Sequence, residues 1–261
     1  TSILVSGEDW DSVKLKAERA LHTIKNWLDF SLLSLNIEKT NFKTFSLSSG
    51  TLPNLNCIKV HDSNCDFAPQ CACSKYINKK SSLKYLGIII DELLTWKDHV
   101  EYVTTKIRKL IHKFYELRET LDFRTLKTVY FALTESVINY GFVVWGNTSL
   151  ATLSKLQVAQ KWIIKIMLFK QKRYSSELVF RDSKILNLEQ LYLKSLIRFM
   201  MKYDFYKEYL EHTACQSHVY CIGPKVYNDV PNSIKRLRYS TVKKELTRWI
   251  IDSQYAINYV I

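Results

Sequence analysis

Apolar side chains recur every three to four residues over most of this chain, and this period restricts the fold more than any other feature. Beyond Trp96, one such stripe contains Val103, Ile107, Leu110, Ile111, Phe114 and Leu121. This spacing is typical of an amphipathic helix that buries one face. The chain also has only six Gly and four Pro among its 261 residues, and a shortage of turn-forming residues favours long helices over a many-stranded β fold.

The same period predicts where the other helices of the second half lie. We expect them over residues 123–140, 150–169, 187–211 and 241–252. An irregular stretch is expected around Gly223-Pro224, since both residues are poor helix formers.

The first part of the chain combines one helix with strand-like segments. The pattern Ser6-Gly7-Glu8-Asp9 has the shape of a capping box, and apolar residues at helical spacing then continue to about Ser34. Strands are predicted over 1–5 and 40–47, a short hairpin within 48–80, and a compact β-rich run over 83–91. The sequence therefore predicts an α+β fold.

Positive charge is concentrated in one part of the chain. The net charge is +13, and the segment from Trp96 to Arg173 carries fourteen Lys and Arg against six Asp and Glu. No acidic residue occurs between Ser136 and Ser176. A basic surface attracts polyanions because each neutralised phosphate releases condensed counterions. Nucleic acid or another polyanion is therefore the favoured partner, and a basic face kept for solubility is the alternative.

The sequence contains no apolar stretch of 18 residues, so a membrane-spanning helix is not expected. The first residues also lack the basic and apolar regions of a signal peptide. Without a secretory signal, the six cysteines are interpreted as thiols and not as a disulfide framework.

The cysteines form two groups that invite a metal interpretation. Cys57, Cys65, Cys71 and Cys73 lie with His61 in one short segment, and His212, Cys215, His218 and Cys221 follow one another at gaps of two residues. The first group contains no Cys-x-x-Cys pair, and the second matches no common zinc finger. A structural zinc ion is the alternative at each group. Partly buried thiols are the favoured interpretation, and no metal ligand is assigned.

Four local patterns, in this order, resemble the reverse transcriptases of LINE-type (non-LTR) retrotransposons, particularly the jockey-like branch. They are the opening Thr1-Ser2-Ile3-Leu4-Val5-Ser6; Trp27 with Leu35-Asn36-Ile37-Glu38-Lys39-Thr40; Lys84-Tyr85-Leu86-Gly87-Ile88 with Asp91 and Trp96-Lys97-Asp98-His99; and Tyr140-Gly141-Phe142-Val143-Val144-Trp145-Gly146 with Gln157 and Gln160-Lys161. The segment from Gly223 to Pro231 is also similar to the C-terminal region of that family.

This resemblance implies a division of the chain. Residues 1–90 would be the last part of a right-hand polymerase palm, 91–173 a helical thumb, and 174–261 a mostly helical C-terminal connection region. In the family, a strand similar to 1–5 follows the aromatic-Ala-Asp-Asp turn that holds the catalytic metals. The chain is therefore expected to start just after the catalytic aspartates, without the fingers and the N-terminal palm. The start at Thr1, with no initiator Met, also suggests a fragment.

The implied activity of the parent protein is RNA-directed DNA polymerisation on an RNA template and a DNA primer. Nucleotidyl transfer needs carboxylates that hold two metal ions, here Mg²⁺, and the family carries them upstream of this segment. The chain alone is therefore expected to be inactive and to bind no cofactor. Glu8, Asp9 and Asp11 are alternative metal ligands, but they fit better as acidic residues in the first turn of a helix.

The resemblance also implies roles for individual residues. Lys39 would give a proton or positive charge to the leaving pyrophosphate, and the alternative is a surface lysine at a turn supported by Asn36. Tyr85, Leu86 and Gly87 would form a primer grip, and the alternative is a buried strand with a bulge at Gly87. Eight basic residues would contact the backbone of the RNA–DNA hybrid without reading its sequence: Lys97, Lys106, Lys109, Lys113, Lys161, Lys165, Lys172 and Arg173.

A different class of function stays open for the chain. It could be a non-catalytic nucleic-acid-binding module derived from a retroelement, in which the basic residues act without any polymerase chemistry. Nuclear action is implied by the family resemblance alone, because no clear basic targeting run occurs.

Overall fold

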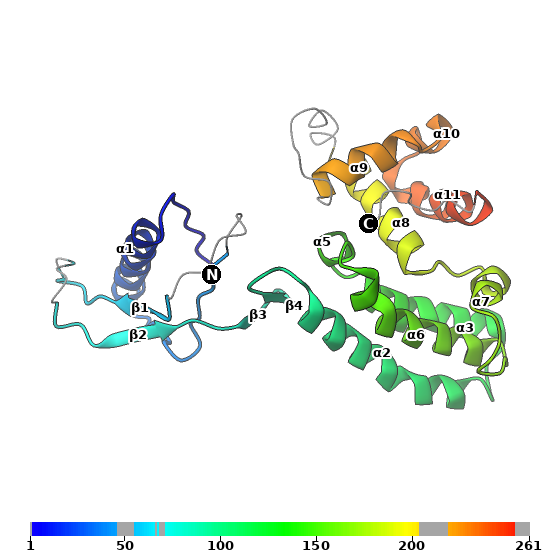
Figure 1. Cartoon of the computed structure of the whole chain (residues 1–261), viewed down its shortest axis with the longest axis horizontal. Helices are drawn as coiled ribbons and strands as arrows, with labels where there is room; N and C mark the ends of the chain where they lie inside the picture. Colours follow the sequence, from blue (N-terminus) through cyan, green and yellow to red (C-terminus); the bar gives the residue numbers. More distant parts are fainter. Residues whose placement is uncertain (1, 46–54, 66, 68–70, 204–218, 254–261) are drawn as a thin grey trace. The chain divides into compact units, whose positions relative to one another are not determined.

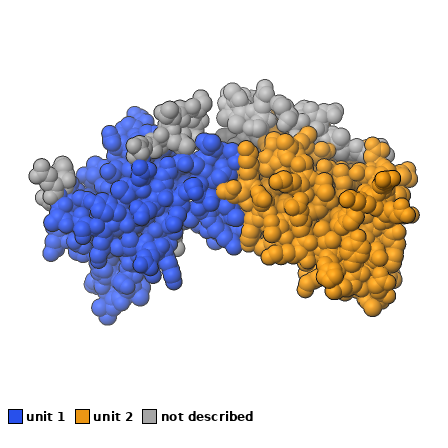
Figure 2. Space-filling model, turned by 60° about the horizontal axis from the view of Figure 1, so that its bottom comes forward, with its two compact units in different colours: residues 1–95 blue, residues 96–261 orange. Residues whose placement is uncertain are grey.

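The computed structural model describes residues 2–45, 55–65, 67, 71–203 and 219–253. The chain divides into two compact units, residues 1–95 and residues 96–261 (Figure 2). Helices and small antiparallel sheets occur together, so the predicted mixed α+β class is confirmed. The residues on both sides of position 173 belong to the second unit.

The described residues of the first unit form one helix and two hairpins (Figure 1). Its elements are α1 (Trp10–Phe30), β1 (Cys57–Val60), β2 (Lys75–Asn78), β3 (Ser82–Tyr85) and β4 (Ile88–Asp91). Helix α1 begins where the carboxylate of Asp9 accepts a hydrogen bond from the backbone N–H of Ser12 at 2.7 Å. Asp9 is therefore the N-cap, and the predicted capping box starting at Ser6 is wrong.

Both hairpins are antiparallel. The first lies where a short hairpin was predicted within 48–80, and the second lies in the β-rich run predicted over 83–91. In the first, β1 and β2 pair from Cys57 opposite Asn78 to Val60 opposite Lys75. The apolar face of this hairpin packs on α1, and together they form a small core of Leu21, Ile58, Val60 and Ile77. Few large side chains are buried here, so this core contributes modest stability.

Two predicted strands are absent. Residues 2–5 have no regular structure, and in the described part of 40–47 there is only an isolated bridge between Phe42 and Lys79. A strand is stabilised by the cross-strand pairs and backbone hydrogen bonds of a neighbour. Apart from the bridge at Phe42, the described strands pair with one another and not with these two segments.

The second unit is entirely helical among its described residues. Its elements are α2 (Lys97–Leu117), α3 (Phe123–Tyr130), the π-helical turn η1 (Phe131–Glu135), α4 (Ser136–Asn139), α5 (Phe142–Trp145), α6 (Leu150–Met167), α7 (Ser176–Ser183), α8 (Leu188–Lys202), α9 (Val219–Asn228), α10 (Asn232–Lys235) and α11 (Tyr239–Asp252). The helices predicted over 123–140, 150–169 and 241–252 are confirmed. The helix predicted over 187–211 is confirmed as far as Lys202, and residues 204–211 lie outside the described part of the chain. Helices α5, α7 and α10 are too short to show an apolar period.

One hydrophobic core runs through this unit. Helices α2 and α6 lie side by side (Figure 1), and the predicted stripe of α2 supplies buried Val103, Ile107 and Phe114. Helices α8, α9 and α11 continue the same core through residues such as Leu196 and Leu246. The helices before and after residue 173 are thus held together by shared apolar burial.

The stretch around Gly223-Pro224 is helical and not irregular as predicted. Both residues lie inside α9, which packs against α8, and both are buried. A proline inside a helix costs about 3 kcal/mol because it removes one backbone hydrogen bond. Burial of the neighbouring Ile222 and Val226 in the core offsets this cost.

Candidate nucleic-acid interface

Three of the predicted lysines share one exposed flank of α2. Lys106, Lys109 and Lys113 are separated by three and four residues and are all exposed. Residues at this spacing lie on the same side of a helix, one turn above another. The ammonium of Lys106 also lies 4.5 Å from the centre of the Tyr102 ring. This arrangement gives a row of cations suited to successive phosphates.

Lys97 does not belong to this row. It is exposed in the first turn of α2, nine residues before Lys106. Nine residues are about two and a half helical turns, so the two side chains leave the helix on opposite sides. Lys97 therefore shares its side of α2 with the exposed Arg108.

The predicted cations of α6 and the segment after it are in different environments. Lys165 is only 9% exposed, and its ammonium donates a hydrogen bond to the backbone carbonyl of Lys172 at 2.7 Å. Burial, followed by the nearby charge of Lys161, lowers the pKa of Lys165. Lys172 and Arg173 are exposed, and Lys172 lies 5.9 Å from the centre of the Trp162 ring. Lys165 thus holds the chain after α6 in place and is not presented to a ligand.

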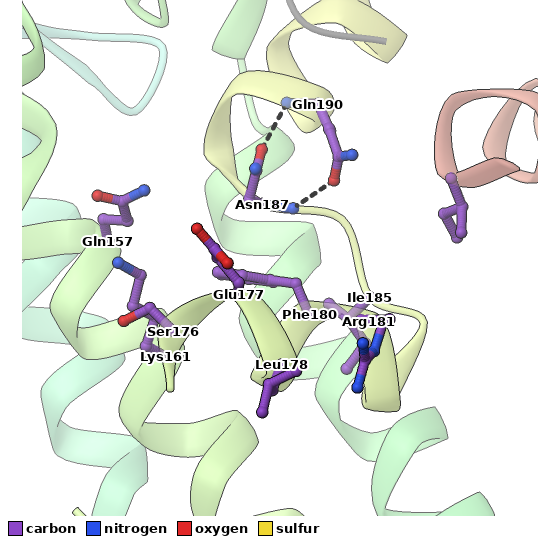
Figure 3. A pocket seen from close by; sticks show the side chains of 11 residues that line it. Gln157, Lys161, Ser176, Glu177, Leu178, Phe180, Arg181, Ile185, Asn187 and Gln190 are labelled. Carbon is purple, nitrogen blue, oxygen red and sulfur yellow. Dashed lines mark hydrogen bonds between the residues drawn. The ribbon is translucent and has the colours of Figure 1, made fainter. Parts of the chain in front are cut away.

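Lys161 lines a pocket that sequence reasoning missed. The pocket has a volume of about 480 Å³ and lies between α6, α7 and the start of α8, with Gln157 and Lys161 on one side and Asn187 and Gln190 on another (Figure 3). The lining residues are Gln157, Lys161, Ser176, Glu177, Leu178, Phe180, Arg181, Ile185, Asn187, Gln190 and Ile251.

The polar wall at α8 is held by a reciprocal pair of hydrogen bonds. The side chain of Asn187 accepts from the Gln190 backbone at 2.8 Å, and the side chain of Gln190 accepts from the Asn187 backbone at 3.1 Å. This is a capping box, and the pattern Asn-x-x-Gln before an apolar run was the signal that could have located it.

The predicted primer-grip residues form the tip of the second hairpin. Leu86 and Gly87 are the two loop residues between β3 and β4, and their φ angles of 45° and 86° are both positive, as a type I′ turn requires. This is a hairpin turn and not the buried strand with a bulge considered as the alternative. The Leu86 side chain is 72% exposed. Its positive φ is unfavourable for leucine, because the Cβ atom lies too close to the backbone in this conformation. The Tyr85 hydroxyl lies 3.1 Å from the hydroxyl of Ser2.

Lys39 is exposed at a turn over residues 37–39. The side chain of Asn36 accepts a hydrogen bond from the Lys39 backbone at 3.0 Å, and the Asn36 carbonyl accepts from the Thr40 hydroxyl at 2.7 Å. Asn36 therefore supports the turn, as the sequence suggested, and the turn presents the lysine side chain to solvent.

The acidic residues near the start of the chain do not fit catalytic magnesium. Asp9 caps α1, and Glu8 and Asp11 are exposed beside it. Among the described residues, the one group of side chains able to surround a metal ion contains no carboxylate. The residues described here therefore do not build a two-metal polymerase site, and no step of nucleotidyl transfer is assigned to them.

That group consists of His61, Cys65, Cys71 and Cys73, whose ligand atoms all lie within 4.8 Å of one another. Cys57 was considered with them, but it is not a member. The other group of the sequence analysis, His212, Cys215 and His218 with Cys221, lies outside the residues whose side chains are described. The sequence spacing of Cys57, Cys65, Cys71 and Cys73 favoured separate thiols. The hairpin instead brings the last three of these cysteines together with His61.

Two of the segments that carry the family resemblance meet in the core of the second unit. His99 is 2% exposed, and its ring meets the ring of Trp145 edge to face with 5.0 Å between centres. Trp145 is fully buried and donates a hydrogen bond from its indole to the Tyr140 carbonyl at 2.9 Å. Gln160, also buried, donates to the Tyr130 hydroxyl and to the Leu186 carbonyl. These motif residues therefore hold the helices together and do not face a ligand.

Burial of His99 predicts a loss of stability in mild acid. Desolvation, with a smaller contribution from the charge of Lys106, lowers the pKa of His99 from 6.5 to about 4. The unfolded chain therefore binds a proton at higher pH than the folded chain does, and stability is lost as the pH falls from 6.5 toward 4. Between pH 7.5 and pH 5, this group is expected to cost about 2 kcal/mol of unfolding free energy.

The measurement compares urea unfolding at the two pH values for the original chain and for His99→Phe. The phenylalanine keeps an aromatic ring against Trp145 but has no titrating group. The loss between pH 7.5 and pH 5 should be smaller in the variant by about 2 kcal/mol. Equal losses in the two proteins would mean that His99 is protonated in the folded state.

The chain has a detectable relative among known proteins. No model of a known protein family matches the chain, and no solved structure does. The chain is 23% identical over 138 residues to the "Probable RNA-directed DNA polymerase from transposon X-element" of Drosophila melanogaster. The matched region covers 52% of this chain and 14% of that protein. The chain thus spans a small part of the length of this relative. No helix among the described residues is long and apolar enough to cross a membrane. The chain is related in sequence to a retrotransposon RNA-directed DNA polymerase.

Proposed function

We propose that this chain is the part of a LINE-type reverse transcriptase, of the jockey-like branch, that follows the catalytic aspartates and holds the template-primer. Residues 1–90 would complete the palm, 91–173 would form the thumb, and 174–261 would be the connection region. The parent enzyme would copy RNA into DNA with two Mg²⁺ ions held by residues outside this chain. Within the chain, Lys39 would stand near the leaving pyrophosphate, where a positive charge favours its departure.

The row of exposed lysines on α2 is the observation that carries this proposal beyond the sequence relationship. Three cations on one flank of a long, rigid helix suit the regular spacing of phosphates along a duplex. Backbone contacts of this kind hold a duplex in register and leave its sequence unread, as copying of any template requires. Lys165 is not proposed to contact the duplex, because its side chain is buried.

The hairpin tip offers a second contact of a different kind. Leu86 is exposed and held at positive φ, a conformation that costs about 1 kcal/mol or more for a residue other than glycine. Strain of this kind is often retained where a backbone must approach a ligand closely. It supports a primer grip at Tyr85, Leu86 and Gly87.

A non-catalytic nucleic-acid-binding module is the second candidate. It needs only the exposed lysines of α2, which can contact a phosphate backbone without any polymerase chemistry. The two candidates share the α2 row but differ in ligand preference. A polymerase part should prefer a primer-template hybrid, whereas a general binding module has no reason to distinguish it from single strands.

The test is binding of the full chain to a labelled RNA–DNA primer-template across a salt series, with heparin as competitor. Replacing Lys106, Lys109 and Lys113 together with alanine should weaken binding on the order of tenfold and reduce the salt dependence by about two to three released counterions. The matched control replaces three other exposed cations, Arg236, Lys243 and Lys244, and should change binding much less.

Each outcome separates the candidates. Preference for the hybrid over single strands, lost in the α2 variant alone, supports the polymerase assignment. Equal binding to hybrid and single strands supports the general module. If both triple variants lose the same affinity, or if heparin competes as well as the hybrid does, only the overall charge of the chain acts and the α2 interface is wrong.

A further inference from the structure

Four metal-binding atoms converge at the loop end of the β1–β2 hairpin, where the connection joins the two strands. His61 follows the last residue of β1, and Cys73 lies two residues before the start of β2. Because Val60 is paired with Lys75, the antiparallel register brings the segments next to these residues together. Cys65 and Cys71 lie in the connection between the strands, and their sulfur atoms reach the same place. We propose that His61, Cys65, Cys71 and Cys73 bind one structural zinc ion.

The distances suit a tetrahedral ion. His61 Nδ1 lies 3.1 Å from Cys65 Sγ and 3.5 Å from Cys71 Sγ, and all four ligand atoms lie within 4.8 Å of one another. Zinc bonds of about 2.1 Å to nitrogen and 2.3 Å to sulfur place tetrahedral ligands roughly 3.6 Å apart. The four atoms therefore need only small shifts to surround an ion.

The chemistry of the donors selects the metal. Three thiolates and one imidazole form a soft set that suits zinc and not magnesium or calcium, which prefer oxygen. Four protein ligands also complete the coordination of zinc and leave no position for water or substrate, which indicates a structural role. Cys57, on β1 itself, is outside the group and would keep a free thiol.

A buried carboxylate stands behind the histidine ligand. His61 is 4% exposed, and its Nε2 has no hydrogen-bond partner among the described residues but lies 3.5 Å from Glu18 Oε2. The other oxygen of Glu18 accepts a hydrogen bond from the Lys59 backbone at 3.1 Å. A carboxylate at this place favours the tautomer with the proton on Nε2, which leaves the lone pair of Nδ1 for the metal.

Donors to the sulfur atoms match the charge that a zinc complex would carry. Three thiolates with one zinc ion have a net charge of −1, and the Lys59 ammonium lies 3.4 Å from Cys71 Sγ. The backbone N–H of Asp62 donates to Cys73 Sγ at 3.3 Å, and that of Phe67 donates to Cys65 Sγ at 3.4 Å. Without a cation, three thiolates this close would repel one another.

The small core of the first unit gives the ion a structural task. Because α1 and the β1–β2 hairpin share only a few buried apolar residues, a bound metal would supply stability that the core lacks. It would tie the long connection between the strands to the hairpin and, through Glu18, to α1.

The experiment uses the full chain, produced with added zinc and purified under reducing conditions without chelator. Metal analysis should find about one zinc per chain, with less than about a tenth remaining in Cys65→Ser and Cys73→Ser. Cys57→Ser is the matched control, since it removes a cysteine of the same hairpin that is outside the group, and it should keep the full amount. Exchange of zinc for cobalt should give the visible absorption of a tetrahedral thiolate complex.

Loss of metal in a ligand variant could also follow from unfolding, so the cobalt spectrum of the unaltered chain is the second measurement. Intense tetrahedral bands with thiolate charge-transfer absorption support the site. The site is wrong if the unaltered chain binds neither zinc nor cobalt, if Cys57→Ser loses as much zinc as Cys73→Ser, or if thiol counting finds the three cysteines oxidised as purified. The α2 triple variant should keep its zinc, so this result is independent of nucleic-acid binding.

Discussion

Replacing Glu135 with alanine is expected to destabilise residues 96–261 by about 3–5 kcal/mol, because it leaves a buried positive charge without its partner. The Lys194 ammonium lies 3.6 Å from Glu135 Oε1, and both side chains are less than a tenth exposed, at 7% and 6%. Desolvation is the largest influence on Lys194 and lowers its pKa. Glu135 also accepts a hydrogen bond from the Asn139 side chain at 3.3 Å, which the substitution removes.

The measurement is urea unfolding followed by tryptophan fluorescence. Of the six tryptophans, Trp10 and Trp27 lie in the first unit, so Trp10→Phe and Trp27→Phe leave only reporters in the second unit. The control is the double variant Glu135→Leu with Lys194→Met, which removes both charges and keeps similar volumes. It should lie within about 1–2 kcal/mol of the parent, or be more stable, because a buried ion pair often contributes little net stability.

The pH dependence of Glu135→Ala gives an independent check. A lysine whose folded-state pKa is lowered binds fewer protons in the folded chain than in the unfolded chain between the two pKa values, so stability rises with pH as it approaches 10.5. Removal of Glu135 should steepen this rise, since the folded-state pKa falls further. A loss below 1 kcal/mol at pH 7 with no added slope would show that water reaches Lys194 in the folded chain.

Gly146→Ala is expected to destabilise the same unit by about 3 kcal/mol or more, because the added methyl group has no space. A Cβ atom at this position would lie 2.5 Å from Cδ2 of Tyr192 and 2.6 Å from the backbone carbonyl oxygen of Phe142. Tyr192 is itself buried, and the carbonyl oxygen accepts the hydrogen bond of the Gly146 backbone at 2.7 Å. Neither neighbour can move without disturbing the junction of α5 and α8.

Gly223→Ala is the matched control for this prediction. Its Cβ would meet only the side chain of Met200, with the sulfur at 2.8 Å, and a methionine can change rotamer at small cost. Alanine also favours a helix over glycine by about 1 kcal/mol. The Gly223 variant should therefore stay within about 1 kcal/mol of the parent in the urea experiment. Equal losses at the two positions would contradict the rigid contact assigned to Gly146.

Gly146 and Gly223 lie in segments that carry the family resemblance, and their substitutions help to separate its structural residues from its functional ones. Trp145 and Gly146 close the packing of α5, and His99 packs against Trp145 in the same core. At these positions the side chains pack helices together and do not face a ligand. The exposed residues Lys39, Leu86 and the α2 lysines are the ones that could touch a ligand, so they carry the functional part of the proposal.

The sequence by itself determined the elements whose signal is local. Helices α2, α6 and α11 follow the apolar period because one face of each must be buried. This period can be recognised from residues that are close together in the sequence. The hairpin at Leu86-Gly87 lies within the β-rich run predicted there, although the positive φ of Leu86 was not expected. The strand expected over 1–5 is absent from its described residues, 2–5, for the opposite reason, since a strand depends on a partner that local sequence does not supply.

Only the tertiary structure decided which residues are exposed and which come together. Lys161 and Lys165 have the same spacing that places Lys109 and Lys113 on one helix face, yet the chain after α6 covers Lys165. The ligand spacing of His61, Cys65, Cys71 and Cys73 follows no familiar metal motif, and the antiparallel register of β1 and β2 closes the distance between them. Periodicity is a property of a few consecutive residues. The burial of a side chain, and the convergence of several side chains on one site, depend on how distant segments pack. Sequence patterns do not reveal that packing directly.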